Sequence, residues 1–254
     1  IRQDLAGAGY PDPLLHVVSN GMDLAKVHAG SNPLAIQYAD RPVILGVGNL
    51  KRTKGLDVFI EALVQIRETH PDVRGVIVGD GPERGRLERR AKRRGVADVL
   101  EMVGAKSPTE TMRYMDACTI FCLPSWSEGF GMVYLEAMAH GKPVIAVERQ
   151  GIAPVVTDPR AGLLVPPRDA AATAAAIRQL LDHPEESLAM GRRGRQAVMH
   201  GFTWSHNARR MVELFRNVVD TCREGMDAPV RAIAHVNFTV DRSVDLKLER
   251  MAAA

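Results

Sequence analysis

The sequence has few of the residues that would assign it to several common classes of protein. It contains only 3 cysteines in 254 residues, and their odd number and irregular spacing do not form a disulfide framework. No apolar run reaches the roughly 18 residues of a membrane span, and no signal peptide precedes the first domain-like pattern. We therefore expect a cytoplasmic protein in a reducing compartment.

Known cofactor motifs are also absent from the sequence. No segment matches a Walker lysine loop or a complete dinucleotide fingerprint. The 8 histidines are scattered, and none forms an i, i+4 pair with a glutamate between. The sequence thus predicts neither a metal site nor a tightly bound cofactor.

The net charge excludes few classes of binding partner, because 33 basic and 30 acidic residues leave a formal net charge of only +3. The basic excess is local, since the predicted helix from Glu83 to Arg94 carries seven basic and two acidic residues. Such a run usually forms a solvated helix face, and contact with nucleic acid, or peripheral contact with anionic lipid at the inner membrane face, is the alternative. We expect no nucleic-acid partner.

Apolar runs of strand length alternate with stretches of helical period. This rhythm predicts β-α-β units and an α/β, Rossmann-like parallel sheet with helices on both faces, over about residues 14–167. The predicted strands are Leu14–Val18, Val43–Val47, Val73–Val78, Val99–Val103, Thr119–Leu123 and Pro143–Val147.

Helical patterns lie between these strands and follow the last one. Within the sheet unit, a helix is predicted between Gly55 and His70, Ser107 is predicted to cap another, and Gly141 to end a third. After residue 167 only helices are predicted: Asp169–Leu181, Glu185–Met199 and Trp204–Cys222. The tail, residues 223–254, shows an alternating pattern from Ala228 onward that fits an edge strand, a hairpin or a poorly ordered segment.

The loop after the strand Val43–Val47 combines glycines with cations. Gly46, Gly48 and Gly55 allow the backbone to approach a ligand, and Lys51, Arg52 and Lys54 precede a helix, which suits an anion. Lysines in a glycine-rich turn are common, so this loop by itself is a weak signal.

The stretch Ser127–Gly131 places two glutamates around a glycine turn. The amides of Phe130 to Val133 are expected to be unpaired donors at a helix N-terminus, where phosphate oxygens bind. Glu136 in the helix suits a ribose diol and Glu128 in the loop a sugar hydroxyl. The alternative is that both glutamates only favour the positive end of the helix dipole. Together the loops favour a nucleotide diphosphate, neutralised by Lys54 and its neighbours, which implies group transfer.

In their order along the chain, these loops resemble the C-terminal, nucleotide-sugar-binding domain of glycosyltransferase family 4. The resemblance covers about residues 14–220. Its motifs are Ser19-Asn20-Gly21-Met22-Asp23, Gly48 with Lys54-Gly55, Gly79-Asp80-Gly81-Pro82, Pro124-Ser125, Ser127-Glu128-Gly129-Phe130-Gly131, Glu136-Ala137 and Gly141-Lys142-Pro143-Val144. Family members are retaining enzymes of the GT-B fold, in which two Rossmann-like domains face each other across a cleft.

The resemblance implies a role for each matching residue. Glu136 would bind the ribose hydroxyls, Glu128 would lie against the donor sugar near its C3 hydroxyl, and Lys54 would hold the diphosphate of a UDP-, GDP- or ADP-sugar. Glu128 and Lys54 are the expected catalytic residues. The expected substrate-binding residues are Glu136, Gly48, Asn49, Lys54, Val103, Gly104, Phe130, Gly131 and Met132, with Val103 and Gly104 facing the base.

Two departures from the family pattern concern the same loops. Asn49 stands where members commonly carry arginine, and Lys51 or Arg52 would then replace that contact. Many members have a Gly-Gly-x-x-Glu loop where this chain has Gln150 to Pro154.

The resemblance also implies an acceptor-binding N-terminal domain ahead of residue 1, which would take a sugar or lipid acceptor. The chain opens on Ile1 rather than methionine, and we interpret residues 1–222 as the donor-binding domain of a longer protein. Two other functions stay open at this stage: a non-catalytic module that binds a nucleotide or a partner chain, and a sugar-nucleotide epimerase of the same architecture.

Overall fold

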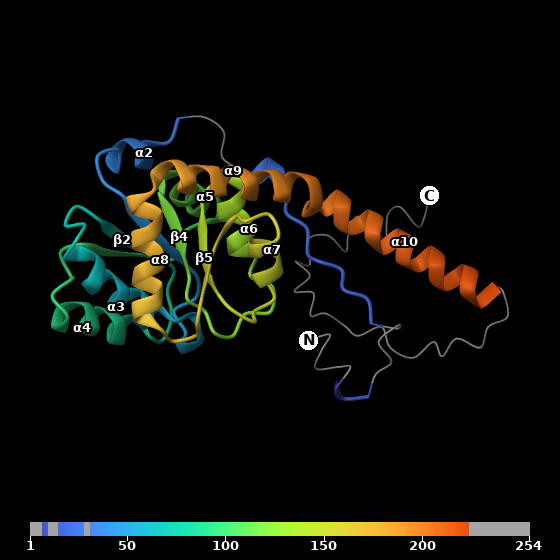
Figure 1. Ribbon diagram of the computed structural model, residues 1–254, viewed down its shortest axis with the longest axis horizontal. Coiled ribbons are helices and arrows are strands. Elements are labelled where there is room, and N and C mark those ends of the chain that lie inside the picture. Colours follow the sequence, from blue (N-terminus) through green and yellow to red (C-terminus); the bar gives the residue numbers. More distant parts are fainter. Residues whose placement is uncertain (1–6, 10–14, 28–30, 224–254) are drawn as a thin grey trace. The chain divides into compact units, whose positions relative to one another are not determined.

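The structure is a computed structural model that describes residues 7–9, 15–27 and 31–223 (Figure 1). Contacts divide the chain into a larger unit, Ser19–Met211, and a smaller one whose described part comprises residues 7–9, 15–18 and 212–223. The larger unit holds the sheet and all the loops named above. The alternating pattern predicted from Ala228 onward lies outside the described residues.

A parallel sheet with strand order β3-β2-β1-β4-β5-β6 forms the centre of the larger unit. Its strands are β1 (Val43–Val47), β2 (Arg74–Val78), β3 (Leu100–Gly104), β4 (Ile120–Cys122), β5 (Val144–Val147) and β6 (Gly162–Val165). This is the order of a doubly wound Rossmann sheet, in which the strand sequence reverses between β1 and β4. Ligands of such sheets bind outside the carboxyl ends of the strands at that point.

Helices connect successive strands and cover the sheet. The helices of the larger unit are α2 (Pro33–Gln37), α3 (Leu56–Arg67), α4 (Arg84–Arg93), α5 (Pro108–Ala117), α6 (Met132–Ala139), α7 (Ala153–Thr157), α8 (Ala170–Asp182) and α9 (Pro184–Gly201), with short 3-10 helices η2 (Leu24–Lys26) and η3 (Arg52–Lys54). Helix α10 (Trp204–Arg223) begins in this unit.

The helices form two groups. Helix α3 packs against α4 and α8, whereas α6 packs against α5 and α9 (Figure 1). Right-handed crossovers that run in opposite directions from β1 and from β4 place these groups on opposite faces. The predicted Rossmann-like fold with helices on both faces is confirmed.

Local sequence signals set the ends of several helices. At α5 the Ser107 side chain accepts from the amide of Glu110, and the Glu110 carboxylate accepts in return from the amide and hydroxyl of Ser107, which lowers the pKa of Glu110. Gly141 has a φ of 70° just after α6. The helix that was predicted to begin at Asp169 does so, because Asp169 caps α8 by accepting from Ala172.

Two strand predictions differ from the structure. The described residues Leu15–Val18 of the predicted strand Leu14–Val18 form no strand, and Val17 is 72% exposed; five apolar-rich residues are a weak signal when no sheet edge pairs with them. Strand β6 was not predicted, because Gly-Leu-Leu-Val is too short for a strand pattern to be distinguished from a turn.

Residues 19–23 lie beside the start of α10, although about 180 residues separate the two in the sequence. Met22 donates to Phe202 O at 2.7 Å and accepts from the amide of Trp204 at 3.3 Å. A Cβ on Gly21 would lie 2.5 Å from the Trp204 backbone. The Ser-Asn-Gly-Met-Asp motif is therefore held against the start of α10 by backbone contact.

Cys118, just before β4, and Cys122, the last residue of β4, both lie in the core. Both are free and buried, and burial raises the pKa of Cys118 to about 12 and raises that of Cys122 as well. Such thiols pack as small apolar side chains.

Candidate functional site

The loops after β1, β2 and β3 share one backbone edge at the carboxyl end of the sheet. The amide of Gly48 donates to Val78 O at 3.0 Å, and that of Gly79 donates to Gly104 O at 2.8 Å. Gly79 also lies against the Gly48 carbonyl, where a Cβ would come within 2.0 Å of the oxygen. Three predicted loop glycines are thus joined directly.

The loop after β1 is also attached to the loop after β4, across the point where the strand order reverses. The Thr53 carbonyl accepts from the hydroxyl of Ser125 and from the amide of Trp126, both at 3.0 Å. Gly55, with a φ of 67°, begins α3 so close to Pro124 that a Cβ would lie 2.0 Å from its carbonyl oxygen. These contacts place η3 directly beside the Ser127–Gly131 stretch.

Lys54 and Glu128 form an ion pair at this junction. The distance from Lys54 Nζ to Glu128 Oε2 is 2.5 Å, and the two side chains are 21% and 15% exposed. The aliphatic part of Lys54 passes over Gly48, because a Cβ on Gly48 would lie only 3.6 Å from Lys54 Cε. The structure therefore brings three predicted site residues, Gly48, Lys54 and Glu128, into one group.

Gly131 ends the glycine turn and caps α6. Its φ is 83°, and α6 begins at Met132 without any side-chain cap, so the first amides of α6 point outward as donors. A Cβ on Gly131 would lie 3.1 Å from Glu128 Cγ and 2.6 Å from the Tyr134 ring. Glu136 follows on the second turn, where it is half-buried.

Tyr134 anchors α6 to the end of β4. Its hydroxyl donates to Leu123 O at 2.5 Å, and its ring packs edge-on against Phe121 at 5.3 Å between centroids. Burial, followed by the nearby Glu128 carboxylate, raises the pKa of Tyr134 well above its ordinary value. The helix that carries Glu136 is thereby fixed with respect to the strand ends.

The remaining predicted residues lie around this group. Val103 and Gly104 end β3, where Gly104 has a φ of 76° and Arg84 Nη2 donates to Met102 O at 3.0 Å. Phe130 is half-buried, with its ring 6.4 Å from that of Phe202. All three residues lie at the same sheet edge, and within the described residues no hydrogen bond or ion pair joins any of them to the Lys54–Glu128 pair.

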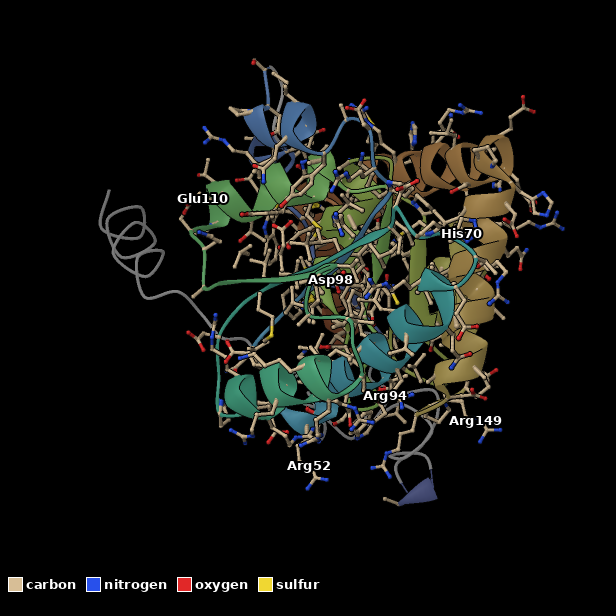
Figure 2. The ribbon with its side chains drawn as sticks, turned by 90° about the vertical axis from the view of Figure 1, so that its left-hand side faces the viewer. Arg52, His70, Arg94, Asp98, Glu110 and Arg149 are labelled. Atoms are coloured by element: carbon tan, nitrogen blue, oxygen red, sulfur yellow. The ribbon has the colours of Figure 1, made fainter. Side chains whose placement is uncertain are left out.

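Asn49 and its cationic neighbours are exposed. A Cβ on Gly81 would lie 2.4 Å from Asn49 Oδ1, so the loops after β1 and β2 are close at this point. Arg52 and, in the loop after β5, Arg149 extend outward into solvent (Figure 2). The side chain of Arg52 therefore lies outside the group formed by Gly48, Lys54 and Glu128.

The sequence analysis gave no role to two residues of the loop after β5 that contact this group. Gln150 Oε1 accepts from the amide of Glu128 at 2.9 Å. A Cβ on the next residue, Gly151, would lie 1.9 Å from Gly129 O. Twenty-two positions separate Gln150 from Glu128, and no local pattern predicts a contact over that interval.

The loop after β6 reaches the same edge. Arg168, which has a φ of 60°, places its guanidinium 4.7 Å from the centre of the Trp126 ring. This cation–π contact joins the loop after β6 to the loop after β4, which carries Glu128.

The basic run on α4 is largely paired with carboxylates. Four of its seven cations make such pairs: Arg84 with Glu88, Arg86 with Asp57, Arg90 with Glu61 and Arg94 with Glu61. Most of these carboxylates belong to α3, so the run joins two helices of one face as well as facing solvent. This arrangement supports the interpretation as a solvated helix face.

Two kinds of feature, a cluster of metal ligands and a membrane-spanning helix, are absent from the described residues. No three His, Cys, Asp or Glu side chains gather there as metal ligands would. No helix in that part of the chain has both the length and the apolar composition needed to cross a membrane.

Residues 36–197 match the model of the family described as glycosyl transferases group 1. The chain belongs to this family. It is 32% identical over 224 residues to the D-inositol 3-phosphate glycosyltransferase of Corynebacterium urealyticum, which covers 82% of this chain and 52% of that protein. The chain spans about half the length of the curated relatives it matches.

Solved structures of glycosyltransferases have the same fold. Sucrose-phosphate synthase from Thermosynechococcus elongatus superposes with a TM-score of 0.73 at 30% identity, over 87% of this chain and 57% of that one. Anabaena HepE in complex with UDP superposes with a TM-score of 0.78 at 22% identity, over 85% of this chain and 61% of that one. At that identity the second likeness concerns the fold alone, which is of the GT-B type.

Proposed function

We propose that this chain is the nucleotide-sugar-binding, C-terminal half of a retaining, family 4 glycosyltransferase. In the complete protein it would transfer a hexosyl group from a nucleotide-diphosphate sugar to an acceptor hydroxyl. The observation that carries this proposal is the Lys54–Glu128 ion pair, which lies at the reversal point of the sheet beside the N-terminus of α6. Membership of the glycosyl transferases group 1 family supports the reaction class.

Each group has a separate part in this proposal. Lys54 and the first amides of α6 neutralise the diphosphate, which makes it a better leaving group. Glu136 accepts hydrogen bonds from the ribose hydroxyls, and Glu128 accepts from a hydroxyl of the donor sugar. The backbone of Val103 and Gly104 faces the base. Most of the catalytic gain is then electrostatic, because these charges are in place before the reaction begins.

Transfer breaks the bond between the anomeric carbon and the diphosphate oxygen. The acceptor oxygen then bonds to the same face of that carbon, and its proton passes to the departing phosphate oxygen. No protein nucleophile and no metal ion take part in this scheme. The positive charge that a metal would otherwise supply comes from Lys54 and the helix dipole.

Acceptor binding is assigned to a separate domain, which would receive a sugar or lipid hydroxyl. The match to about half of each relative's length supports a donor half within a longer protein. Residues 1–222 form that donor-binding half in this proposal, and a polysaccharide or glycolipid pathway at the cytoplasmic side of a membrane is its setting.

Titration calorimetry of the chain with UDP, GDP and ADP in EDTA tests donor binding. We expect one nucleotide to bind, and both Lys54→Ala and Glu136→Ala to weaken it. Lys92→Ala, which removes an exposed cation from α4, is the matched control and is expected to change the affinity little. If no nucleotide bound, or if Lys92→Ala weakened binding as much as Lys54→Ala, the assignment of this site would be wrong.

A further inference from the structure

Glu128 is held at its main chain as well as at its carboxylate. The backbone amide donates to Gln150, the carboxylate pairs with Lys54, and the side-chain stem lies against Gly131. We propose that Gln150 is a positioning residue that sets the orientation of Glu128 toward the donor sugar. This inference rests on the proposed function, because it assigns Glu128 to the sugar.

In a regular helix or strand a backbone carbonyl would accept the hydrogen bond from the Glu128 amide, and here the side chain of Gln150 accepts it instead. Glu128 lies in an irregular segment between β4 and α6, and within the described residues no backbone carbonyl accepts from its amide. Gln150 Oε1 fills that place at 2.9 Å, which is an ordinary hydrogen-bond length. Without this acceptor, the Glu128 amide would form only transient hydrogen bonds to water.

The loop after β5 is built to present Gln150 in this direction. Arg149 has a φ of 59°, a left-handed conformation that turns the chain sharply after β5. The carbonyl of Gln150 accepts from Ala153 at 3.0 Å, which fixes its main chain at the start of α7. Gly151 then lies against Gly129 O, where a Cβ would come within 1.9 Å. Gln150 and Gly151 therefore contact two successive residues of the turn, Glu128 and Gly129.

Loss of the hydrogen bond from the Glu128 amide to Gln150 would affect a nucleotide sugar and a nucleoside diphosphate differently. A mobile Glu128 would hold the sugar less well, so a nucleotide sugar should bind more weakly. The same mobility would loosen the pair with Lys54 and leave that cation free for phosphate, so a nucleoside diphosphate should bind as tightly as before or more tightly. General loosening of the fold would instead weaken both ligands.

The test compares Gln150→Met, which keeps the side-chain length but removes the acceptor, with Gln150→Glu, which keeps an acceptor oxygen. Calorimetry would use UDP with UDP-glucose, GDP with GDP-mannose and ADP with ADP-glucose, on the full chain. For Gln150→Met we expect the nucleotide sugar to bind about fivefold more weakly, as expected for one lost hydrogen bond. The nucleoside diphosphate should show no loss.

Hydrogen exchange of the Glu128 amide gives a readout that needs no ligand. Exchange should accelerate about fivefold or more in Gln150→Met and stay near the wild-type rate in Gln150→Glu. Gln179→Met, an exposed glutamine on α8, is the matched control and should change neither exchange at Glu128 nor binding.

Equal weakening of both ligands, or unchanged exchange at Glu128 in Gln150→Met, would overturn the positioning role. Failure of the wild-type chain to bind any of the six ligands would instead overturn the proposed function. In that case the exchange rates would still decide whether Gln150 holds the Glu128 turn.

Discussion

Replacement of Glu128 by glutamine tests whether the ion pair with Lys54 competes with a bound diphosphate. In the structure the Lys54 ammonium is already neutralised by a carboxylate at 2.5 Å. A diphosphate can use that cation only by displacing or sharing the carboxylate. Glu128→Gln keeps the size and the hydrogen-bonding capacity of the side chain but removes its charge, so Lys54 becomes available to phosphate.

The magnitude follows from the distance and the burial of the pair. At 2.5 Å and an effective dielectric constant of about 20, the direct attraction is roughly 7 kcal/mol. Lost hydration and side-chain entropy offset most of this, and exposed pairs contribute at most about 1 kcal/mol. The pair here is mostly buried, so we take about 1 kcal/mol as the net gain when the competitor is removed. That corresponds to about fivefold tighter binding of a nucleoside diphosphate.

Calorimetric titration with the nucleoside diphosphate that binds the wild-type chain measures this change. The gain should shrink as salt is added, because screening weakens the attraction between Lys54 and phosphate. Glu148→Gln is the matched control, since it removes one carboxylate from the loop after β5 without breaking the pair. Equal or weaker binding to a folded Glu128→Gln chain would refute the reasoning, as would an equal gain in Glu148→Gln.

Three further predictions concern the elements that support the site. Tyr134→Phe should lower the free energy of unfolding in urea by about 1–2 kcal/mol, because a buried carbonyl loses its donor; Tyr114→Phe, at a half-buried position, should cost less. Gly55→Ala should cost more than about 2 kcal/mol, since Cβ would overlap backbone, whereas Gly95→Ala meets open space and should cost only about 1 kcal/mol; equal costs would contradict this.

The third concerns pH. Because the fold lowers the pKa of Glu110, its contribution is present above the unfolded pKa of about 4.3 and is lost as pH falls through the folded value. Wild type should therefore unfold at a higher temperature than Glu110→Gln at pH 7, and the gap should shrink as the pH falls below about 4; a constant gap would contradict the assignment.

The fold was predictable because its signals are local. Val43–Val47 and Val144–Val147 are apolar throughout, and every residue in them is buried, as strands covered on both faces require. Ser107-Pro108 with Glu110 gives a capping box that needs only four residues. Such patterns fix where an element begins and what it packs against, before any partner is known.

The site was predictable only in part, because its defining contacts join distant segments. The sequence indicated that Lys54 and Glu128 were functional, through the glycines and charges around them. It contained no sign that the two would pair with each other across 74 positions. Gln150 drew attention only as a departure from the family pattern, and its contact with Glu128 depends on how two loops meet.

The glycines of these loops have a second role that the sequence could not show. Gly55 was interpreted as a place where the backbone approaches a ligand, yet at Gly55, as at Gly79 and Gly151, the nearest neighbour is the carbonyl of another loop. A Cβ at any of them would lie 2.0 Å or less from that oxygen. These glycines set the distances between loops after β1, β2, β4 and β5, and so between Lys54 and the turn that carries Glu128. A substitution at Gly151 should therefore disturb donor binding even though its own atoms need not touch the donor.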